Sequence, residues 1–283
     1  MSRNRDRMGQ PTTQHADPPQ QALQENAGFS FVVPTEFVEL PSGGRFYDES
    51  HPLHNQTTIE IKQMTAREED LLTSPTLLKS GVAIERVIQS LIMDKRVAPD
   101  TLLVGDRNAI LIAARISGYG SEYTTKVTCP ACSTTQEHSF NLHELEAVDN
   151  PVNSALDITD NKNGTFTTIL PRTGLSVEFK LLNGRDEKRM LSQIENQRKR
   201  KRAEANVTTQ MKSLLVSVNG ETSPQAIQYL VDNIPSIDSR HIRACYKLVN
   251  PNIDMSQFFT CQECGHEEEL EVPLTADFFW PDR

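Results

Sequence analysis

The sequence predicts an α+β protein made of two homologous, helix-rich halves that meet at one zinc site. Two Cys-x-x-Cys motifs, Cys129–Cys132 and Cys261–Cys264, lie 132 residues apart. Each is flanked by residues that alternate between polar and apolar, which is the pattern of a strand, so each predicts a strand–CxxC–strand zinc knuckle. Two thiolates at this spacing supply half of a tetrahedral zinc shell, and two knuckles complete it. We therefore expect the knuckles to pair into one Cys₄ site that resembles a zinc ribbon.

Other parts of the chain match one another in the same order as the knuckles. The matching segments are 59–62 with 177–180 at a shift of 118, 88–93 with 211–216 at a shift of 123, and 106–142 with 238–274 at a shift of 132. Chance matches rarely keep their order, and a growing shift means that the second half carries insertions. The sequence thus indicates an internal duplication.

The duplication divides the chain into three parts. Residues 1–28 are rich in Gln, Pro, Thr and Asn and have almost no large apolar side chain, so we expect an extended N-terminal arm. The first repeat covers 29–150, and the second covers 151–283 and carries the aromatic tail Phe278-Phe279-Trp280. Such a tail either packs on the nearby knuckle or anchors in a neighbouring subunit. We expect both the arm and the tail to contact other chains.

Turn and capping residues define the first repeat. Pro41 and the glycines after it predict a turn, with Leu40 and the Phe46–Tyr47 pair as hairpin flanks. Thr65 and Glu68 form a capping-box pattern, and the run Glu68-Glu69-Asp70 is expected on a solvated helix face. The other expected elements are a strand at 57–64, an amphipathic helix at 82–93, a helix from its N-cap Asp106 to Ile116 that Gly118 and Gly120 end, and strands at 122–128 and 135–142.

The second repeat follows a similar plan with a longer helical stretch. A hairpin is expected over 165–182, followed by a long helix from about Arg185 past Arg202. The remaining expected elements are a helix at 209–218, a short helix that begins at Ser223-Pro224, a helix capped by Asp238, and a strand–knuckle–strand unit at 256–272. Cys245 lies in an apolar helical stretch, so we expect it to be a small buried side chain.

The cysteines favour a structural metal. Of the five cysteines, four lie in the motifs, which indicates a reducing compartment and metal binding and not a disulfide framework. A shell of four thiolates leaves zinc no open position for water, so one Zn²⁺ per chain would be structural. A thiol–disulfide switch and an inert pair of motifs are the alternatives. Three nearby histidines are expected at the surface and not as ligands: His138, His143 and His266.

Composition and motifs disfavour several functional classes. The net charge of −9 and the glutamates around the second motif disfavour a general nucleic-acid binder, because such binding depends on neutralising phosphates. No apolar run of about 18 residues is present, so no transmembrane helix is expected. We find no motif of an NTPase, dinucleotide-binding enzyme, serine hydrolase or zinc protease, and expect no catalytic residues. The basic run Arg198–Arg202 fits a solvated helix face, a docking site for an acidic partner, or a nucleic-acid contact.

Three segments in series, followed by the motif after Tyr123, resemble the baseplate hub proteins of T-even-like contractile-tailed phages. The segments are Leu40–Tyr47, Ile59–Lys62 and Thr65–Glu69. The resemblance is clearest over residues 34–143. It implies a virion or tail-assembly component, made in the host cytoplasm and placed in the tail baseplate, with no catalytic residues to carry over.

The partners that the resemblance implies are other baseplate and tail proteins, with further copies of the chain as an additional candidate. No membrane is expected, and nucleic acid is disfavoured. The rival hypothesis is a zinc-ribbon regulator that binds nucleic acid, whose affinity would fall steeply with salt. An enzyme with a metal-activated water would need an open position on the zinc.

Overall fold

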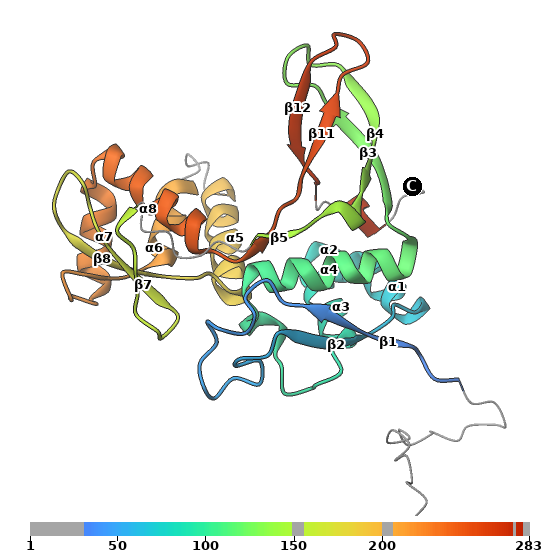
Figure 1. Cartoon of the computed structure of the whole chain (residues 1–283), viewed down its shortest axis with the longest axis horizontal. Coiled ribbons are helices and arrows are strands. Elements are labelled where there is room, and N and C mark those ends of the chain that lie inside the picture. Colours follow the sequence, from blue (N-terminus) through green and yellow to red (C-terminus); the bar gives the residue numbers. More distant parts are fainter. Residues whose placement is uncertain (1–30, 149–155, 200–205, 274–275, 280–283) are drawn as a thin grey trace, which may run out of the picture. The chain divides into compact units, whose positions relative to one another are not determined.

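A computed structural model describes residues 31–148, 156–199, 206–273 and 276–279. Residues 34–283 form one unit, separate from residues 1–33, and Figure 1 shows its helices and strands. Helices alternate with small antiparallel sheets, so the predicted α+β class is confirmed. None of the described helices is both long enough and apolar enough to cross a membrane.

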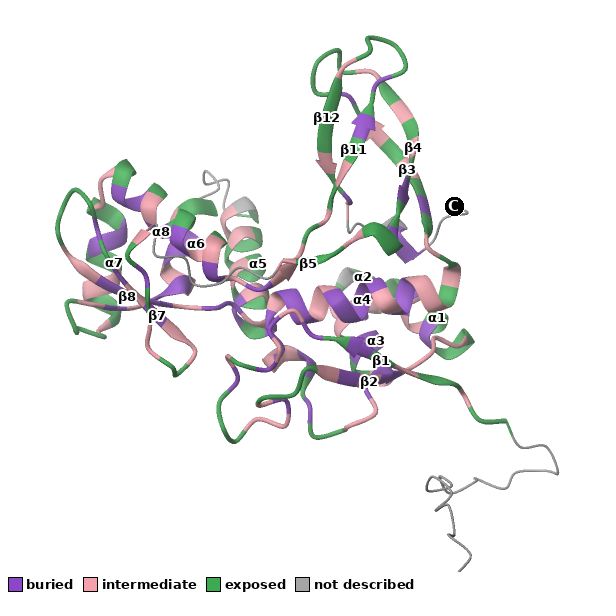
Figure 2. Cartoon of the chain, viewed as in Figure 1, coloured by how far each residue is buried: buried purple, intermediate pink, exposed green. Residues whose placement is uncertain are grey.

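The N-terminal part of this unit packs helices on a two-stranded antiparallel sheet. Its elements are β1 (Thr35–Glu39), β2 (Thr58–Lys62), α1 (Ala66–Thr73), α2 (Pro75–Lys79), α3 (Ala83–Leu91) and α4 (Val104–Tyr119). The apolar positions of the strand and the amphipathic helices converge, so Ile61, Val87 and Ile110 are fully buried. Figure 2 shows this buried layer along α4 and the strand pair.

The second helical part is built around a four-stranded antiparallel sheet in the order β6-β7-β8-β9. The strands are β6 (Thr159–Asp160), β7 (Thr165–Ile169), β8 (Ser176–Lys180) and β9 (Leu215–Val218). The helices are α5 (Gly184–Lys199), α6 (Asn206–Leu214), α7 (Pro224–Asn233) and α8 (Ser236–Val249). The predicted hairpin over 165–182 is therefore confirmed.

Two long hairpins carry the cysteine motifs, and Figure 1 shows them side by side. The strands of the first are β3 (Glu122–Thr128) and β4 (Thr135–Asn141), and those of the second are β11 (Ser256–Thr260) and β12 (Glu267–Glu271). Below them, the short strands β5 (Ala147–Val148) and β10 (Asn252–Ile253) pair antiparallel. Segments from the middle and from the C-terminal end of the unit thus meet twice.

Asp106 and Asp238 are not N-caps, which corrects the sequence prediction. Both lie inside the first helical turn and point to a loop from another part of the chain. The Asp106 carboxylate accepts hydrogen bonds from the Ser42 N–H at 3.0 Å and the Tyr47 hydroxyl at 2.6 Å. Asp238 accepts from the backbone N–H groups of Arg172 and Thr173 at 2.8 and 3.1 Å. Burial raises the pKa of Asp106, although these donors oppose the shift.

Glu68 was expected on a solvated face, and this expectation is wrong. Its capping-box contact with Thr65 is confirmed, but the side chain is fully buried. The carboxylate also accepts from Lys62 Nζ at 2.6 Å and from Ser90 Oγ at 2.5 Å. Donors on β2 and α3 compensate the cost of burying a charge, and the helix pattern around Glu68 does not show them.

Other expectations need smaller corrections. Leu40 and the Phe46–Tyr47 pair do not flank a hairpin, because β1 pairs with β2 and all three residues lie in the connecting loop. The expected helix at 209–218 ends at Leu214, and the next four residues join the sheet as β9. Apolar residues in both elements face the core, so periodicity alone does not distinguish them. Gly120 ends α4 with a φ of 84°, whereas Gly118 lies inside the helix. The part of α5 expected past Arg202 lies outside the described residues.

The expectation that the aromatic tail contacts other chains is wrong for Phe278 and Phe279. They form the 3₁₀ helix η4 (Ala276–Phe279) and are 1% and 2% exposed. Phe278 packs edge-on against Tyr123 with ring centroids 5.1 Å apart, and its carbonyl accepts from Arg115 Nε at 2.7 Å. The apolar surface beside α4 takes up these rings, so they belong to the core. Trp280 and the N-terminal arm lie outside the described residues.

Candidate metal centre

The tips of the two hairpins bring together the four cysteines that the sequence singled out. Each residue has a Sγ atom within 4.8 Å of the Sγ atoms of the other three. Cys129 Sγ lies 3.8 Å from Cys264 Sγ, and Cys132 Sγ lies 3.7 Å from Cys261 Sγ. The first cysteine of each motif is buried and the second is exposed.

The sulfur spacing fits a tetrahedral thiolate site. Zinc–sulfur bonds of about 2.3 Å place the corners of a tetrahedron about 3.8 Å apart, because its edge is about 1.6 times the centre-to-corner distance. The two Sγ–Sγ distances of 3.7 and 3.8 Å agree with this value. A disulfide requires about 2.05 Å, and all five cysteines are free thiols. The donor set therefore suits a metal that prefers soft thiolate ligands.

Each knuckle owes its turn to the same backbone hydrogen bonds. The N–H of Cys129 donates to the Thr134 carbonyl at 2.9 Å, and that of Cys261 donates to the His266 carbonyl at 2.8 Å. The residue after each motif is in the left-handed region, with φ of 61° at Ser133 and 68° at Gly265. This region suits glycine and strains serine slightly. Each turn directs its two thiols toward the same point, so the four sulfur atoms lie close together.

Two glutamines tie the hairpins together beside the cysteines. The Gln136 side chain donates to the Thr260 carbonyl at 3.2 Å and accepts from the Gln262 N–H at 2.9 Å. Gln257 does the same with the backbone of Asn141, at 2.6 and 3.0 Å. Sequence reasoning missed both residues, because no local signal shows which glutamine faces another strand pair.

The histidines lie outside the group of four thiols. His138 is half-buried between the rings of Phe140 and Phe259, with centroid distances of 4.6 and 5.3 Å, and burial lowers its pKa. It is a packing residue and not simply a surface residue as expected. His143 is exposed, and His266 is partly exposed and contacts Glu268.

The electrostatics of the thiols differ within the cluster. Hydrogen bonds from the Thr134 side chain and backbone lower the pKa of Cys132 to about 6. The His266 backbone N–H lowers the pKa of Cys264, but the neighbouring thiols raise it more, to about 12. Four sulfurs this close repel one another once they ionise, so all four become thiolates together only beside a cation.

The outer surface of the second knuckle is acidic. Five glutamates are exposed on and around β12: Glu263, Glu267, Glu268, Glu269 and Glu271. A surface of this sign repels phosphate, so it disfavours the nucleic-acid hypothesis at this knuckle.

Comparison with known families decides what kind of protein this is. A family model described as T4 bacteriophage base plate protein matches residues 33–280, a range that includes both knuckles. The chain belongs to this family. Membership implies a structural role in the phage baseplate. No curated protein matches the chain. No solved structure matches it either.

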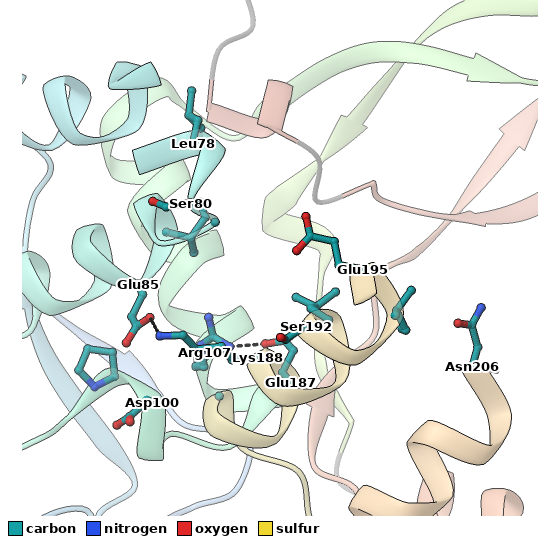
Figure 3. A pocket seen from close by; sticks show the side chains of 16 residues that line it. Leu78, Ser80, Glu85, Asp100, Arg107, Glu187, Lys188, Ser192, Glu195 and Asn206 are labelled. Atoms are coloured by element: carbon teal, nitrogen blue, oxygen red, sulfur yellow. Dashed lines mark hydrogen bonds and ion pairs between the residues drawn. The ribbon is translucent and has the colours of Figure 1, made fainter. Parts of the chain in front are cut away.

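This baseplate protein also has a cavity of about 690 Å³ between α3, α4 and α5. Figure 3 shows two pairs of oppositely charged side chains that point toward one another. Lys188 pairs with Glu85 at 3.2 Å, and Arg107 forms an ion pair with Glu187. The ion pairs link α5 to the N-terminal helices.

The fifth cysteine is a small buried side chain, as the sequence indicated. Cys245 is fully buried, and its Sγ lies 3.4 Å from His241 Nε2 and 3.8 Å from Thr168 Oγ1. Burial raises the pKa of its thiol, which keeps it protonated and unreactive.

Proposed function

We propose that this protein is a non-catalytic scaffold or assembly component of the hub region of a contractile phage tail baseplate. The family match over residues 33–280 carries the proposal. The hub assignment rests on the ordered series of segments between residues 34 and 143 described above. Its partners are other baseplate and tail proteins, and further copies of the chain are a second candidate. The protein is made in the host cytoplasm and then incorporated into the baseplate.

We further propose that the first repeat, 29–150, and the second repeat, 151–283, are copies of one ancestral unit. Equivalent backbone pairings support the proposal. Ile61 of β2 forms a bridge with Ile92, and Phe179 of β8 pairs with Leu215. Phe179 lies 118 residues after Ile61, and Leu215 lies 123 residues after Ile92. These are the same shifts at which the sequences match. A helical segment and then a cysteine-bearing hairpin follow in each case.

Equivalent polar contacts support the duplication independently of the sheet. Lys62 donates to Glu68 at 2.6 Å, and Lys180 donates to Asp186 at 2.8 and 2.7 Å, again 118 residues further on. Asp106 and its counterpart Asp238 both accept from a loop N–H, as described above. Such buried contacts depend on accurate three-dimensional placement, so their recurrence supports common ancestry of the halves.

In this proposal, one zinc ion joins the halves through Cys129, Cys132, Cys261 and Cys264. The two close sulfur pairs are Cys129 with Cys264 and Cys132 with Cys261. If the two knuckles trade places, each of these pairs becomes the other. That pattern is the mark of a two-fold arrangement, in which each partner offers the same surface. Zinc would supply only cross-linking, because four thiolates fill its shell.

Metal analysis of the purified full chain tests the zinc proposal. We expect about one zinc per chain, and Cys261→Ser should remove most of it because three thiolates do not complete the shell. The matched control is Cys245→Ser, which should keep the zinc because that thiol is not part of the four-cysteine group and lies beside His241 and Thr168. Zinc content that is zero in the natural chain, or equal in the two variants, would contradict the proposal.

The role in the hub needs a test in the particle. Tails purified from a phage that encodes a tagged copy of the chain should carry the tag at the centre of the baseplate by electron microscopy. Presence in assembly intermediates but not in finished tails would select the assembly-factor form of the proposal. Absence from both would overturn it.

A further inference from the structure

The first strand of the N-terminal sheet has an open edge. β1 pairs with β2 on one side, and no described residue pairs with it on the other. The register shows which groups face outward. Gln63 N–H donates to the Pro34 carbonyl and Leu40 N–H to the Thr57 carbonyl, so the even-numbered residues of β1 bond to β2. The N–H and C=O groups of Thr35, Phe37 and Glu39 therefore point away from the sheet.

The other half of the unit shows how the same edge is satisfied. β7 occupies the place of β1 at a shift of 130, and β6 covers it. The Asn161 N–H donates to the Thr165 carbonyl at 3.0 Å, and Thr159 pairs with Thr167 in the same register. Thr165 and Thr167 are the counterparts of Thr35 and Phe37. The edge groups that are bonded in β7 are thus unbonded in β1 among the described residues.

The sequence before each strand explains the difference. A turn with left-handed residues, φ of 61° at Lys162 and 78° at Gly164, lets β6 fold back on β7. The four residues before β1 read Phe-Val-Val-Pro and contain no glycine or asparagine. They lack the residues that such a turn requires. A strand that covers β1 must therefore arrive by another route.

The exposed side chains of β1 also fit an interface. Phe37 is 71% exposed, whereas its counterpart Thr167 is a small polar residue that is partly covered. Thr35, Phe37 and Glu39 project from the same face, and all three are exposed. A large aromatic side chain beside an open edge is a combination that soluble sheets normally avoid.

We propose that the edge of β1 accepts an extended strand from another baseplate protein, which completes the sheet as β6 does in the other half. This inference rests on the proposed baseplate function. The incoming strand carries a β-branched or aromatic side chain opposite Phe37, and a lysine or arginine near Glu39, because cross-strand pairs of these kinds are favourable. The chain's own arm is a poor candidate, since residues 10–28 include three prolines and only one leucine among large apolar residues.

Hydrogen–deuterium exchange with mass spectrometry tests the proposal on the natural full-length chain. In peptides that cover 34–40, the outward amides of Thr35, Phe37 and Glu39 should exchange quickly in the purified chain and at least about tenfold more slowly in purified tails, whereas the amides bonded to β2 should exchange slowly in both. Peptides that cover 164–170 are the internal control, because β6 already protects that edge, and they should exchange slowly in both samples. Equal exchange of 34–40 in both samples would overturn the proposal.

Two further results would also overturn it. Protection of 34–40 in the dilute purified chain that disappears when residues 1–28 are deleted would assign the edge to the chain's own arm. Protection that grows with protein concentration would assign it to a second copy. Tails that lack the chain altogether would instead contradict the baseplate function itself, so the two failures are distinguishable.

A pair of variants separates the backbone edge from the side chain. Phe37→Pro removes an outward N–H that β2 does not use, so the variant should fold but enter tails about tenfold less well than the natural chain. Phe37→Thr keeps the N–H and copies Thr167, so it should enter tails better than Phe37→Pro. Equal incorporation of the proline variant and the natural chain would contradict the proposal. The exchange measurement decides the question if Phe37→Pro does not fold.

Discussion

At the scale of single residues, Glu68 joins three elements through one buried carboxylate. It accepts from Lys62 on β2, from Thr65 at the start of α1 and from Ser90 on α3. Burial alone would raise its pKa, but the hydrogen bonds from Lys62, Ser90 and Thr65 lower the pKa to about 2. The charged form is therefore the one that stabilises the fold.

We predict that Glu68→Gln lowers the free energy of unfolding at pH 7 by about 2 kcal/mol, because whichever oxygen it replaces, the amide nitrogen turns its own hydrogens toward two donors. A lowered pKa stabilises the fold above the unfolded value, and the stabilisation is lost as the pH falls from about 5 toward about 2. The difference between variant and natural chain should therefore shrink over that range. Urea unfolding at several pH values measures it.

The control for this prediction is Glu69→Gln. Glu69 is the exposed neighbour, and its carboxylate accepts a hydrogen bond from the Tyr119 hydroxyl at 3.2 Å. The control should change stability by less than about 0.5 kcal/mol at any pH. A Glu68→Gln chain as stable as the natural one at pH 7 would show that the hydrogen bonds to the charged carboxylate do not stabilise the fold.

At the scale of elements, α4 is the helix on which the parts of the unit meet. Its first turn lies against β10, and a side-chain bond of 3.2 Å joins Asn108 to Asn252. Gly105 permits this approach, because a Cβ there would lie 2.0 Å from the Pro251 carbonyl oxygen. A glycine inside a helix costs about 1 kcal/mol relative to alanine, so close packing explains its presence here.

We predict opposite effects for two glycine-to-alanine changes on this one helix. Gly105→Ala should destabilise the unit by about 2 kcal/mol or more, because backbone on both sides must move. Gly118→Ala should be neutral or stabilise it by up to about 1 kcal/mol, because its Cβ would meet only the Met64 side chain at 3.4 Å and beyond. Thermal melts of both variants measure this, and equal melting temperatures would contradict the packing argument.

At the scale of the whole molecule, the N-terminal arm and the C-terminal aromatics have different expected roles. Phe278 and Phe279 are part of the core, whereas residues 1–28 have a composition that does not form one. We predict that deletion of residues 1–28 leaves the melting temperature of the purified chain within about 1 °C of the natural value. The same deletion should reduce incorporation into tails, because arms of this kind order themselves on their partners.

Two measurements check that prediction: a thermal melt of the purified chain, and the amount of chain in purified tails. An earlier melt together with normal incorporation would show that the arm stabilises the folded unit and that its composition is a poor guide.

Local patterns determined much of this protein. The two Cys-x-x-Cys motifs, their flanking strands and the buried role of Cys245 were predictable, because each depends on spacing or alternation within a few residues. Sequence matches at ordered shifts also indicated that the cysteine motifs belong together, and the four thiols do lie within 4.8 Å of one another. The series of short segments in the first half was enough to indicate the baseplate family.

Only the tertiary structure decided the roles of the buried polar residues and of the edges. Glu68 and Asp106 look like surface and capping residues locally, because a donor to Glu68 lies 22 residues away and a donor to Asp106 lies 64 residues away. Gln136 and Gln257 became bridges only when the two hairpins lay side by side. The last residues of the expected helix at 209–218 became β9, since a neighbouring strand offered hydrogen bonds there. The physical reason is the same throughout: a local pattern reports what a residue prefers, whereas its partner comes from a distant part of the chain.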